Sequence, residues 1–132
     1  MAMDNPVLSA SLNSISIEEI KRQLGPPPTS AVIVKADHVV GVFIYQNSGQ
    51  VNDNHCHDYD EWWLVLEGEI DWVVEDRGTV HAKAGDFVFV PARTFHHIFP
   101  TGGKPSIRLG VALPGHGHLH EKPERTVRIT LE

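Results

Sequence analysis

Residues 55–61 read His55-Cys56-His57-Asp58-Tyr59-Asp60-Glu61, and the rest of the chain is best interpreted outward from this stretch. In a β-strand, side chains two residues apart point to the same side, so His55 and His57 present two imidazoles to one volume while Cys56 faces away. The polar step over residues 58–60 can turn the chain and return the carboxylate of Glu61 toward the same point. The stretch therefore predicts part of a metal site.

His96, beyond the next predicted hairpins, would complete a set of three imidazole nitrogens and one carboxylate oxygen. This set suits Fe(II), Mn(II), Ni(II) or Zn(II), and an octahedral ion with these ligands keeps two positions for water or substrate. We therefore predict one divalent transition metal as cofactor, held by His55, His57, Glu61 and His96.

The glycines around these residues add a family resemblance. Gly49 precedes His55 and Gly68 follows Glu61 at the spacing G-x5-H-x-H-x3-E-x6-G, which resembles the first motif of the cupin superfamily. The second cupin motif is G-x5-P-x-G-x2-H-x3-N, and its glycine, proline and histidine align with residues of this chain: Gly85, Pro91 and His96.

The resemblance covers about residues 30–113 and implies a small, single-domain, metal-binding cupin. The fold it implies is an all-β, cupin-type β-barrel, also called a double-stranded β-helix or jelly roll, with the metal on the four residues named above. Because cupins include oxygenases, isomerases, lyases and non-enzymatic modules, the fold alone does not select a reaction.

Two positions depart from the second motif. Where the family has glycine, this chain has Arg93, and a positive φ would strain a non-glycine residue by about 1 kcal/mol, so we expect a different type of turn there. Where the family has asparagine, this chain has Pro100, which offers neither a side-chain amide nor a backbone N–H. Pocket contacts made by that asparagine are therefore not expected here.

The composition bounds the class of protein. The chain has 132 residues, 41% hydrophobic and 21% charged, which predicts one soluble domain, and its net charge of −6 argues against nucleic acid and anionic membranes as partners. The sequence shows no apolar run of about 18 residues and no signal peptide pattern, and the lone Cys56 cannot form an internal disulfide. We expect a cytoplasmic protein that binds a small molecule.

The first 29 residues are predicted to form an N-terminal arm. Ser16 and Glu19 match a capping box that starts a short helix, and Gly25 followed by three prolines ends that helix and makes a rigid hinge. Residues 30–132 then form one β-barrel domain. Short runs rich in Val, Ile, Phe and Trp predict strands at 31–35, 39–46, 61–67, 69–75, 86–90, 95–99, 106–113 and 126–131.

Both faces of the strand at 61–67 are apolar, because Trp63 and Val65 lie on one side while Trp62, Leu64 and Leu66 lie on the other. A strand of this kind is covered on both sides. We therefore expect a homodimer. Either a partner covers the outer face, or the arm crosses over and packs on the neighbour through its apolar residues, Ile17, Ile20 and Leu24.

The same alternation predicts residues of a substrate pocket. If Glu61 binds the metal, Trp63 and Val65 share its side of the strand and form an apolar wall, although Trp63 could equally be plain barrel core. Tyr45 is a further polar candidate for this pocket.

Arg108 is the last candidate, and two placements stay open. It alternates with Ile107 and Leu109, so its guanidinium enters the barrel and can hold a carboxylate if those residues fill the outer face. Otherwise Arg108 is a surface or interface charge.

The remaining histidines are given weaker roles. His97 directly follows His96 in a predicted strand, so its side chain points to the opposite side and is expected outside the pocket. His116, His118 and His120 could bind a second metal, but their glycine-rich surroundings favour an exposed or lid-like tail.

Two functions are compatible with these residues. The first is a metal-dependent enzyme acting on a small organic molecule, with oxygenase (dioxygenase) chemistry favoured over isomerase or lyase chemistry. The second is a non-enzymatic module that uses the same pocket to sense or carry a ligand. The motifs assign no catalytic acid or base, so the catalytic residues stay open.

Overall fold

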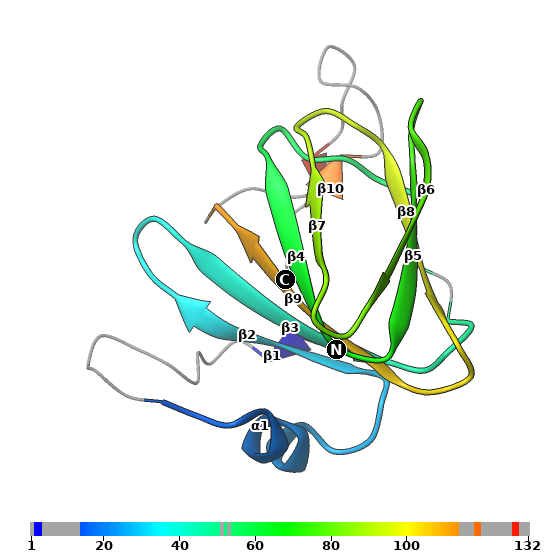
Figure 1. The fold of residues 1–132 in the computed structure, drawn as a ribbon. Helices are drawn as coiled ribbons and strands as arrows, with labels where there is room; N and C mark the ends of the chain where they lie inside the picture. Colours follow the sequence, from blue (N-terminus) through cyan, green and yellow to red (C-terminus); the bar gives the residue numbers. More distant parts are fainter. Residues whose placement is uncertain are drawn as a thin grey trace.

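Two β-sheets face each other around a common interior in the computed structural model (Figure 1). The structure describes residues 2–3, 14–50, 52, 54–113, 118–119 and 128–129. Its elements are β1 (Ala2–Met3), α1 (Ile17–Leu24), β2 (Thr29–Lys35), β3 (Val40–Gln46), β4 (Glu61–Glu67), β5 (Glu69–Val74), β6 (Gly78–Lys83), β7 (Phe87–Val90), β8 (His96–Thr101), β9 (Ser106–Ala112), β10 (His118–Leu119) and β11 (Arg128–Ile129).

The strand order shows how the chain winds. The larger sheet has the order β1-β2-β3-β9-β4-β7, the smaller one has the order β6-β5-β8, and β10 and β11 form a separate pair. The chain passes to the smaller sheet after β4, returns to the larger one for β7, enters the smaller one again for β8 and returns for β9. All pairs in these sheets are antiparallel except β1 with β2. Two sheets connected in this way form a double-stranded β-helix, which confirms the predicted fold class, although hydrogen bonds do not close the sheets into one ring.

The predicted strands from 31–35 to 106–113 agree with the observed ones to within two residues at each end. The sequence pattern missed β6, because only Ala82 is buried in it and its hydrophobic alternation is weak. Of the expected strand at 126–131, the structure describes β11 alone, and the other residues lie outside the described ranges.

Helix α1 begins and ends as its capping residues predict. The Ser16 Oγ accepts a hydrogen bond of 3.1 Å from the Glu19 backbone N–H, and Gly25, at φ 80°, donates its N–H to the Lys21 carbonyl. The carboxylate of Glu19 accepts hydrogen bonds from Arg22 and Gln23. These contacts fix a helix of two turns in front of the prolines.

Helix α1 covers part of the outer face of the larger sheet. Ile20 packs there with Phe43 of β3 and Ile107 of β9 in a cluster that also includes Ala31 and Ile33. Helix α1 therefore packs on its own barrel, and the alternative in which Ile17, Ile20 and Leu24 pack on a neighbouring subunit does not agree with this arrangement. The division at residues 29 and 30 stays a prediction.

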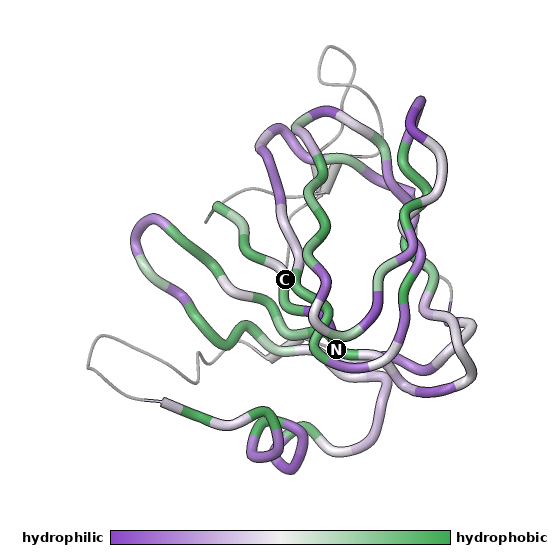
Figure 2. The backbone as a smooth tube through the Cα atoms, viewed as in Figure 1, coloured by the Kyte–Doolittle hydropathy of each residue, from purple (hydrophilic) through white to green (hydrophobic). Residues whose placement is uncertain are grey.

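A second cluster fills the space between the sheets. Its buried members come from both sheets: Trp63, Val65, Ile70, Trp72, Val74, Ala82, Val88, Val90 and Ile98. Hydrophobic residues follow β7, whereas hydrophilic ones gather at the turn between β5 and β6 (Figure 2). Trp63 and Val65 of β4 thus face the interior, as the alternation of side chains along this strand predicts.

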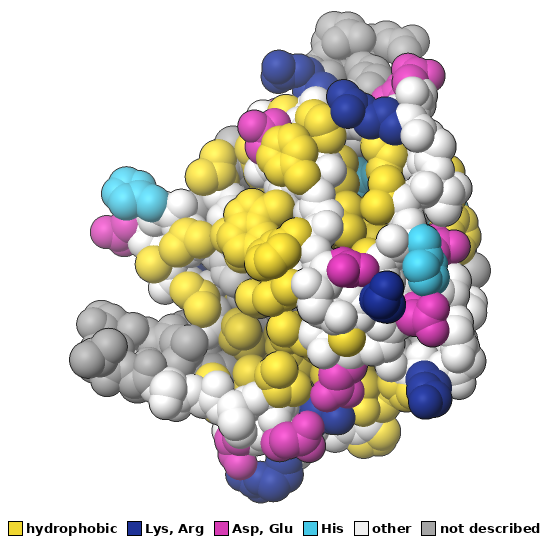
Figure 3. Space-filling view, in the orientation of Figure 1, with side chains coloured by type: hydrophobic (Ala, Val, Ile, Leu, Met, Phe, Trp, Pro, Cys, Tyr) yellow, Lys and Arg dark blue, Asp and Glu magenta, His cyan; other side chains and the backbone are white. Residues whose placement is uncertain are grey.

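The outer side of β4 and β7 carries exposed aromatic rings. Trp62 is 40% exposed, Phe87 68% and Phe89 59%, and the Trp62 and Phe87 ring centroids lie 5.8 Å apart. Hydrophobic side chains form a broad group on this face (Figure 3). Contiguous exposed apolar surface of this kind commonly marks an interaction site.

Among the described residues, no helix is long and apolar enough to span a membrane.

An exposed polar ladder links β5 and β6. The two ring nitrogens of His81 contact Asp71 Oδ1 at 2.5 Å and Glu69 Oε1 at 3.0 Å. The hydrogen bond to Asp71, supported by Glu69, raises the pKa of the His81 imidazole above its usual value, although partial desolvation lowers it. A histidine with a raised folded-state pKa stabilises the protein below its unfolded-state pKa, and this contribution is lost as pH rises through the folded-state pKa.

We predict that His81→Asn lowers the free energy of unfolding mainly below pH 6.5 and that the deficit shrinks as pH rises above neutrality. Urea denaturation at several pH values measures this difference. His38→Asn, at an exposed position away from this ladder, is the control and should give no such pH profile. An NMR titration in which the His81 ring has a pKa at or below about 6.5 would contradict the assignment.

Candidate metal centre

A pair of backbone hydrogen bonds positions two of the four predicted ligands. His55 and His96 form an antiparallel bridge, in which the His55 N–H donates to the His96 carbonyl at 3.1 Å and the His96 N–H donates to the His55 carbonyl at 2.9 Å. His57 follows two residues later with the same parity. Three imidazoles are therefore directed into one volume by backbone geometry.

The three rings lie close together. Ring centroids are 4.4 Å apart for His55 and His96, 5.0 Å for His55 and His57, and 5.7 Å for His57 and His96. Each ring offers one nitrogen, and these nitrogens lie within 4.8 Å of one another. All three histidines are buried, at 0–5% exposure, so a metal ion held there would be shielded from solvent.

Glu61, the first residue of β4, brings a carboxylate to the same place. Its Oε2 lies 3.3 Å from Nε2 of His57, and its Oε1 lies 3.6 Å from Nε2 of His96. Burial raises the pKa of this carboxyl to about 7, while the Trp63 hydrogen bond and the Arg108 charge act in the opposite direction. The donor set and its separations fit a first-row divalent ion, which would favour the ionised carboxylate.

The turn before His96 differs from the sequence prediction. Arg93 has φ 56°, so the positive φ occurs although the residue is not glycine. In this conformation the Arg93 N–H donates a hydrogen bond of 2.6 Å to the carbonyl of His57, and the neighbouring Ala92 N–H donates to Asp60. These bonds tie the turn to the histidine segment, and about 1 kcal/mol per hydrogen bond is enough to offset a strain of similar size.

The predicted apolar wall lies inside the barrel. Val65 is fully buried, and Trp63 is 5% exposed with its Nε1 donating a hydrogen bond of 2.9 Å to Glu61 Oε1. Gly110 of β9 lies under the indole, and a Cβ atom at this position would stand 2.5 Å from a ring carbon of Trp63. Sequence reasoning missed Gly110, because a glycine within an apolar strand run has no distinctive signal.

Of the two placements considered for Arg108, the structure has the inward one. Arg108 is 3% exposed, its Nη1 donates a hydrogen bond of 2.7 Å to Gln46 Oε1, and its guanidinium carbon lies 5.1 Å from the centre of a Trp63 ring. Burial lowers its pKa to about 10, and the nearby charge of Glu61 acts in the opposite direction. Ile107 occupies the outer cluster beside α1, which fulfils the condition for the inward placement.

Tyr45 does not line the interior, so this pocket assignment is corrected. Its ring packs in the outer cluster, and Lys21 Nζ of α1 lies 5.7 Å from its centroid. The parity of β3 explains the error: Tyr45 shares the outer side with Phe43, while the next residue, Gln46, points inward to Arg108. Sequence reasoning missed Gln46 as an interior residue, and the signal that could have identified it is its place as the polar end of an otherwise apolar strand.

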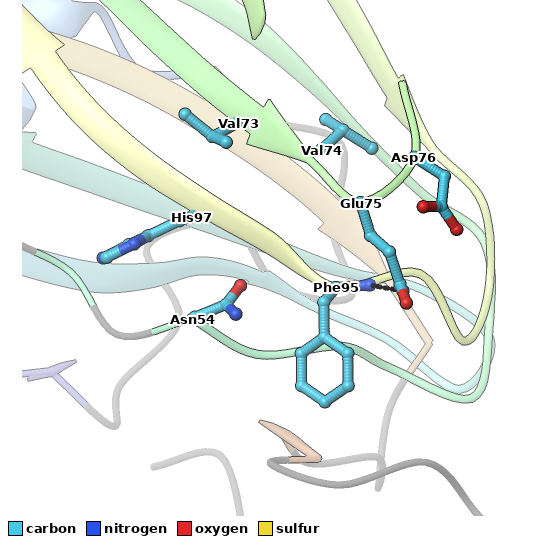
Figure 4. Close-up of a pocket in the computed structure, with 7 residues that line it drawn as sticks. All are labelled: Asn54, Val73, Val74, Glu75, Asp76, Phe95 and His97. Atoms are coloured by element: carbon cyan, nitrogen blue, oxygen red, sulfur yellow. Dashed lines mark hydrogen bonds between the residues drawn. The ribbon is translucent and has the colours of Figure 1, made fainter. Parts of the chain in front are cut away.

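His97 lies outside the imidazole cluster, as its parity predicts. It lines a surface cleft of about 430 Å³ together with Asn54, Val73 and Phe95, and Figure 4 shows its side chain on this cleft. The ring of Phe99 packs against it at a tilt of 45°, with centroids 4.3 Å apart. The side chains of His116, His118 and His120 lie outside the described residues.

Comparison with known proteins agrees with this architecture. The family model for the cupin domain matches residues 41–111. An uncharacterized protein of Bacillus subtilis, YdbB, is 35% identical over 60 residues, which is 46% of this chain and 51% of that protein. The chain therefore matches about half the length of this curated relative.

Solved structures share the fold. An uncharacterized conserved protein with a double-stranded β-helix domain from Klebsiella pneumoniae superposes with a TM-score of 0.68 at 23% identity, covering 84% of this chain and 100% of that chain. The polyketide cyclase RemF from Streptomyces resistomycificus superposes with a TM-score of 0.59 at 22% identity, covering 78% of this chain and 71% of that chain. Fold and buried histidines thus define a small cupin-type β-domain with a candidate metal centre. The chain belongs to the cupin family.

The position of Trp63 beside the predicted ligands gives a spectroscopic prediction. Addition of Co(II) to the metal-free protein should quench Trp63 more strongly than Trp62, because the Trp63 indole contacts Glu61 while Trp62 faces outward. Trp62→Phe should therefore retain the strongly quenched fluorescence and Trp63→Phe should lose it. Trp72 is present in both variants and cancels in the comparison. The reverse assignment would place the metal on the other side of β4.

Proposed function

We propose that the protein is a metal-dependent cupin enzyme that acts on a small organic molecule. The observation that carries this proposal is the convergence of four buried donor groups, those of His55, His57, His96 and Glu61, in one volume. A divalent transition metal bound there, whether Fe, Mn, Ni or Zn, would supply Lewis acidity, and iron would add redox chemistry with dioxygen. Dioxygenase chemistry is the form of this proposal that we favour.

The residues around the donors would shape the reaction volume. Trp63 and Val65 supply an apolar wall that excludes water, and the Trp63 N–H holds one oxygen of Glu61 and so orients its carboxylate. Arg108 supplies a positive charge at the far side of the indole. This combination suits a small substrate with an apolar part and a polar or charged end.

A second candidate function is a non-enzymatic module that binds or senses a small ligand. The observation that favours it is the burial of the four donor residues, which are at most 5% exposed and leave little access for turnover. The polyketide cyclase RemF supports only the statement that this fold also hosts enzymes, since identity at 22% indicates the fold alone.

We predict that the protein, purified without a histidine tag, binds one equivalent of a transition metal and that His57→Ala lowers the metal affinity at least about tenfold. Elemental analysis and competition with a chelating dye measure both. His38→Ala, at an exposed site, is the matched control. A content below about a tenth of an equivalent after reconstitution would refute the metal site, and an equal loss in His116→Ala would move it to the tail.

Turnover separates the two functions. The metal-loaded protein is assayed against catechols, small diketones, sugars and hydroxy acids, with oxygen consumption and product formation followed in parallel, with and without added Fe(II). The enzyme proposal expects turnover of at least one class that is lost in His57→Ala. Tight binding of a ligand without turnover would favour the binding module.

We further propose that the exposed aromatic face of β4 and β7 is covered by a second copy of the chain. Trp62, Phe87 and Phe89 form a contiguous apolar surface on β4 and on β7, the last strand of the larger sheet as described, and a self-complementary interface would bury it.

The homodimer makes a direct prediction. Light scattering at micromolar concentration should give about twice the mass of the 14.7 kDa chain, and Phe87→Asp with Phe89→Asp should shift the protein to the monomer without unfolding it. Val80→Asp, at an exposed apolar position on β6 in the other sheet, is the control. A monomer in the wild type would contradict the dimer.

A further inference from the structure

We propose that Arg108 is the anchor of a binding site for the carboxylate group of a small ligand, in the cleft between β2, β3 and β9. If this ligand is the substrate of the metal centre, the site gives the proposed enzyme a substrate class, and that part of the inference rests on the proposed function. Binding of the carboxylate itself requires residues of this chain alone.

The first support is an unsatisfied guanidinium. Arg108 is 3% exposed, its Nη1 donates to Gln46, and its Nε is buried with no hydrogen-bond partner among the described residues. Arginine carries five N–H donors in a planar fork, and a buried donor without an acceptor costs free energy. A carboxylate bound to the guanidinium would supply acceptors and lower this cost.

The second support is the charge balance around Arg108. In the described part of the chain, the guanidinium contacts two neutral groups, the amide of Gln46 and the ring of Trp63. The charge that influences it electrostatically belongs to Glu61, which lies with His57 and His96 and accepts the Trp63 hydrogen bond. Within the described part of the chain Arg108 has no ion pair, and buried charges are rarely left in this state. A monoanion matches its single charge.

The third support is the cleft onto which Arg108 opens. Its volume is about 320 Å³, and Thr29, Gln46 and Asn52 line it together with Arg108. Ser30 also lines the cleft, and it pairs with Ile44 across β2 and β3, so its side chain lies on the same side of the sheet as Ile44 and Arg108. A cleft lined by a guanidinium, a hydroxyl and two amide side chains suits a carboxylate.

The amide side chains hold the cleft in a fixed form. Asn52 and Gln46 exchange hydrogen bonds of 2.9 and 3.2 Å, and the Asn52 amide also donates to the Ile98 carbonyl at 3.0 Å. This arrangement directs the oxygen of Gln46, and not its NH2 group, at Arg108. Ile44 and Pro28 supply apolar surface on the same cleft, which fits a carboxylate attached to an apolar body.

The test uses the metal-free, full-length protein and two matched probe pairs. Isothermal titration calorimetry measures binding of benzoate and acetate, with benzamide and acetamide as neutral analogues of the same shape. We expect at least one carboxylate to bind about tenfold or more tightly than its amide, because a hydrogen-bonded charge is lost in the amide. Trp63 fluorescence should respond to the carboxylate, since its ring lies against the guanidinium.

Two variants address Arg108 directly. Arg108→Met keeps the volume and should lower carboxylate affinity at least about tenfold while leaving the amides unaffected. Gln46→Glu retains Arg108 but places a carboxylate against it, so this variant should also abolish binding. It tests the proposal even if Arg108→Met does not fold. Arg77→Met, which removes an exposed arginine, is the control for net charge and should bind as the wild type does. Thermal melts check folding.

Equal affinity for carboxylate and amide, no binding of either, or full binding in Arg108→Met or Gln46→Glu would overturn the proposal. An equal loss in Arg77→Met would also overturn it, because binding would then follow the net charge. Carboxylate binding seen only in metal-loaded protein and unchanged in Arg108→Met would assign the carboxylate to the metal, which refutes this site and leaves the proposed function intact. Binding through Arg108 in a protein that takes up no metal would support this site while the metal-dependent function fails.

Discussion

The reciprocal backbone hydrogen bonds between His55 and His96 are the constraint on which the candidate site depends. They join a loop residue to the first residue of β8, and so bring the two halves of the winding chain together at one point. Because the bridge uses main-chain atoms, it positions both imidazoles without using their ring nitrogens. The side chains can then converge with those of His57 and Glu61 in a volume walled by the two sheets.

Much of this arrangement is predictable from the sequence, because it follows from strand parity. The two-residue spacing of His55 and His57 places both rings on one side, and Glu61 and Trp63 lie together by the same rule. The start and end of α1 follow from Ser16 and Gly25, whose capping roles require only local backbone geometry. Patterns of this kind are reliable because they depend on neighbours along the chain.

The features that sequence reasoning missed depend on contacts across the fold. Arg93 adopts a positive φ because its N–H meets the carbonyl of His57, a partner that no local pattern reveals. Tyr45 was placed on the wrong side because β3 is apolar on both faces, and only the position of α1 distinguishes them. Strand β6 was missed because it is largely exposed, so its pairing with β5 leaves little hydrophobic signal.

The contact of Trp63 with Gly110 limits how the interior can vary. The indole lies so close to the main chain of β9 that even a methyl group at position 110 would require the ring to move. Movement of the ring would disturb Glu61 on one side and Arg108 on the other, because Trp63 contacts both. A substitution at position 110 would therefore be felt at both the carboxylate of Glu61 and the guanidinium of Arg108, although the three atoms nearest to a Cβ at this position all belong to Trp63.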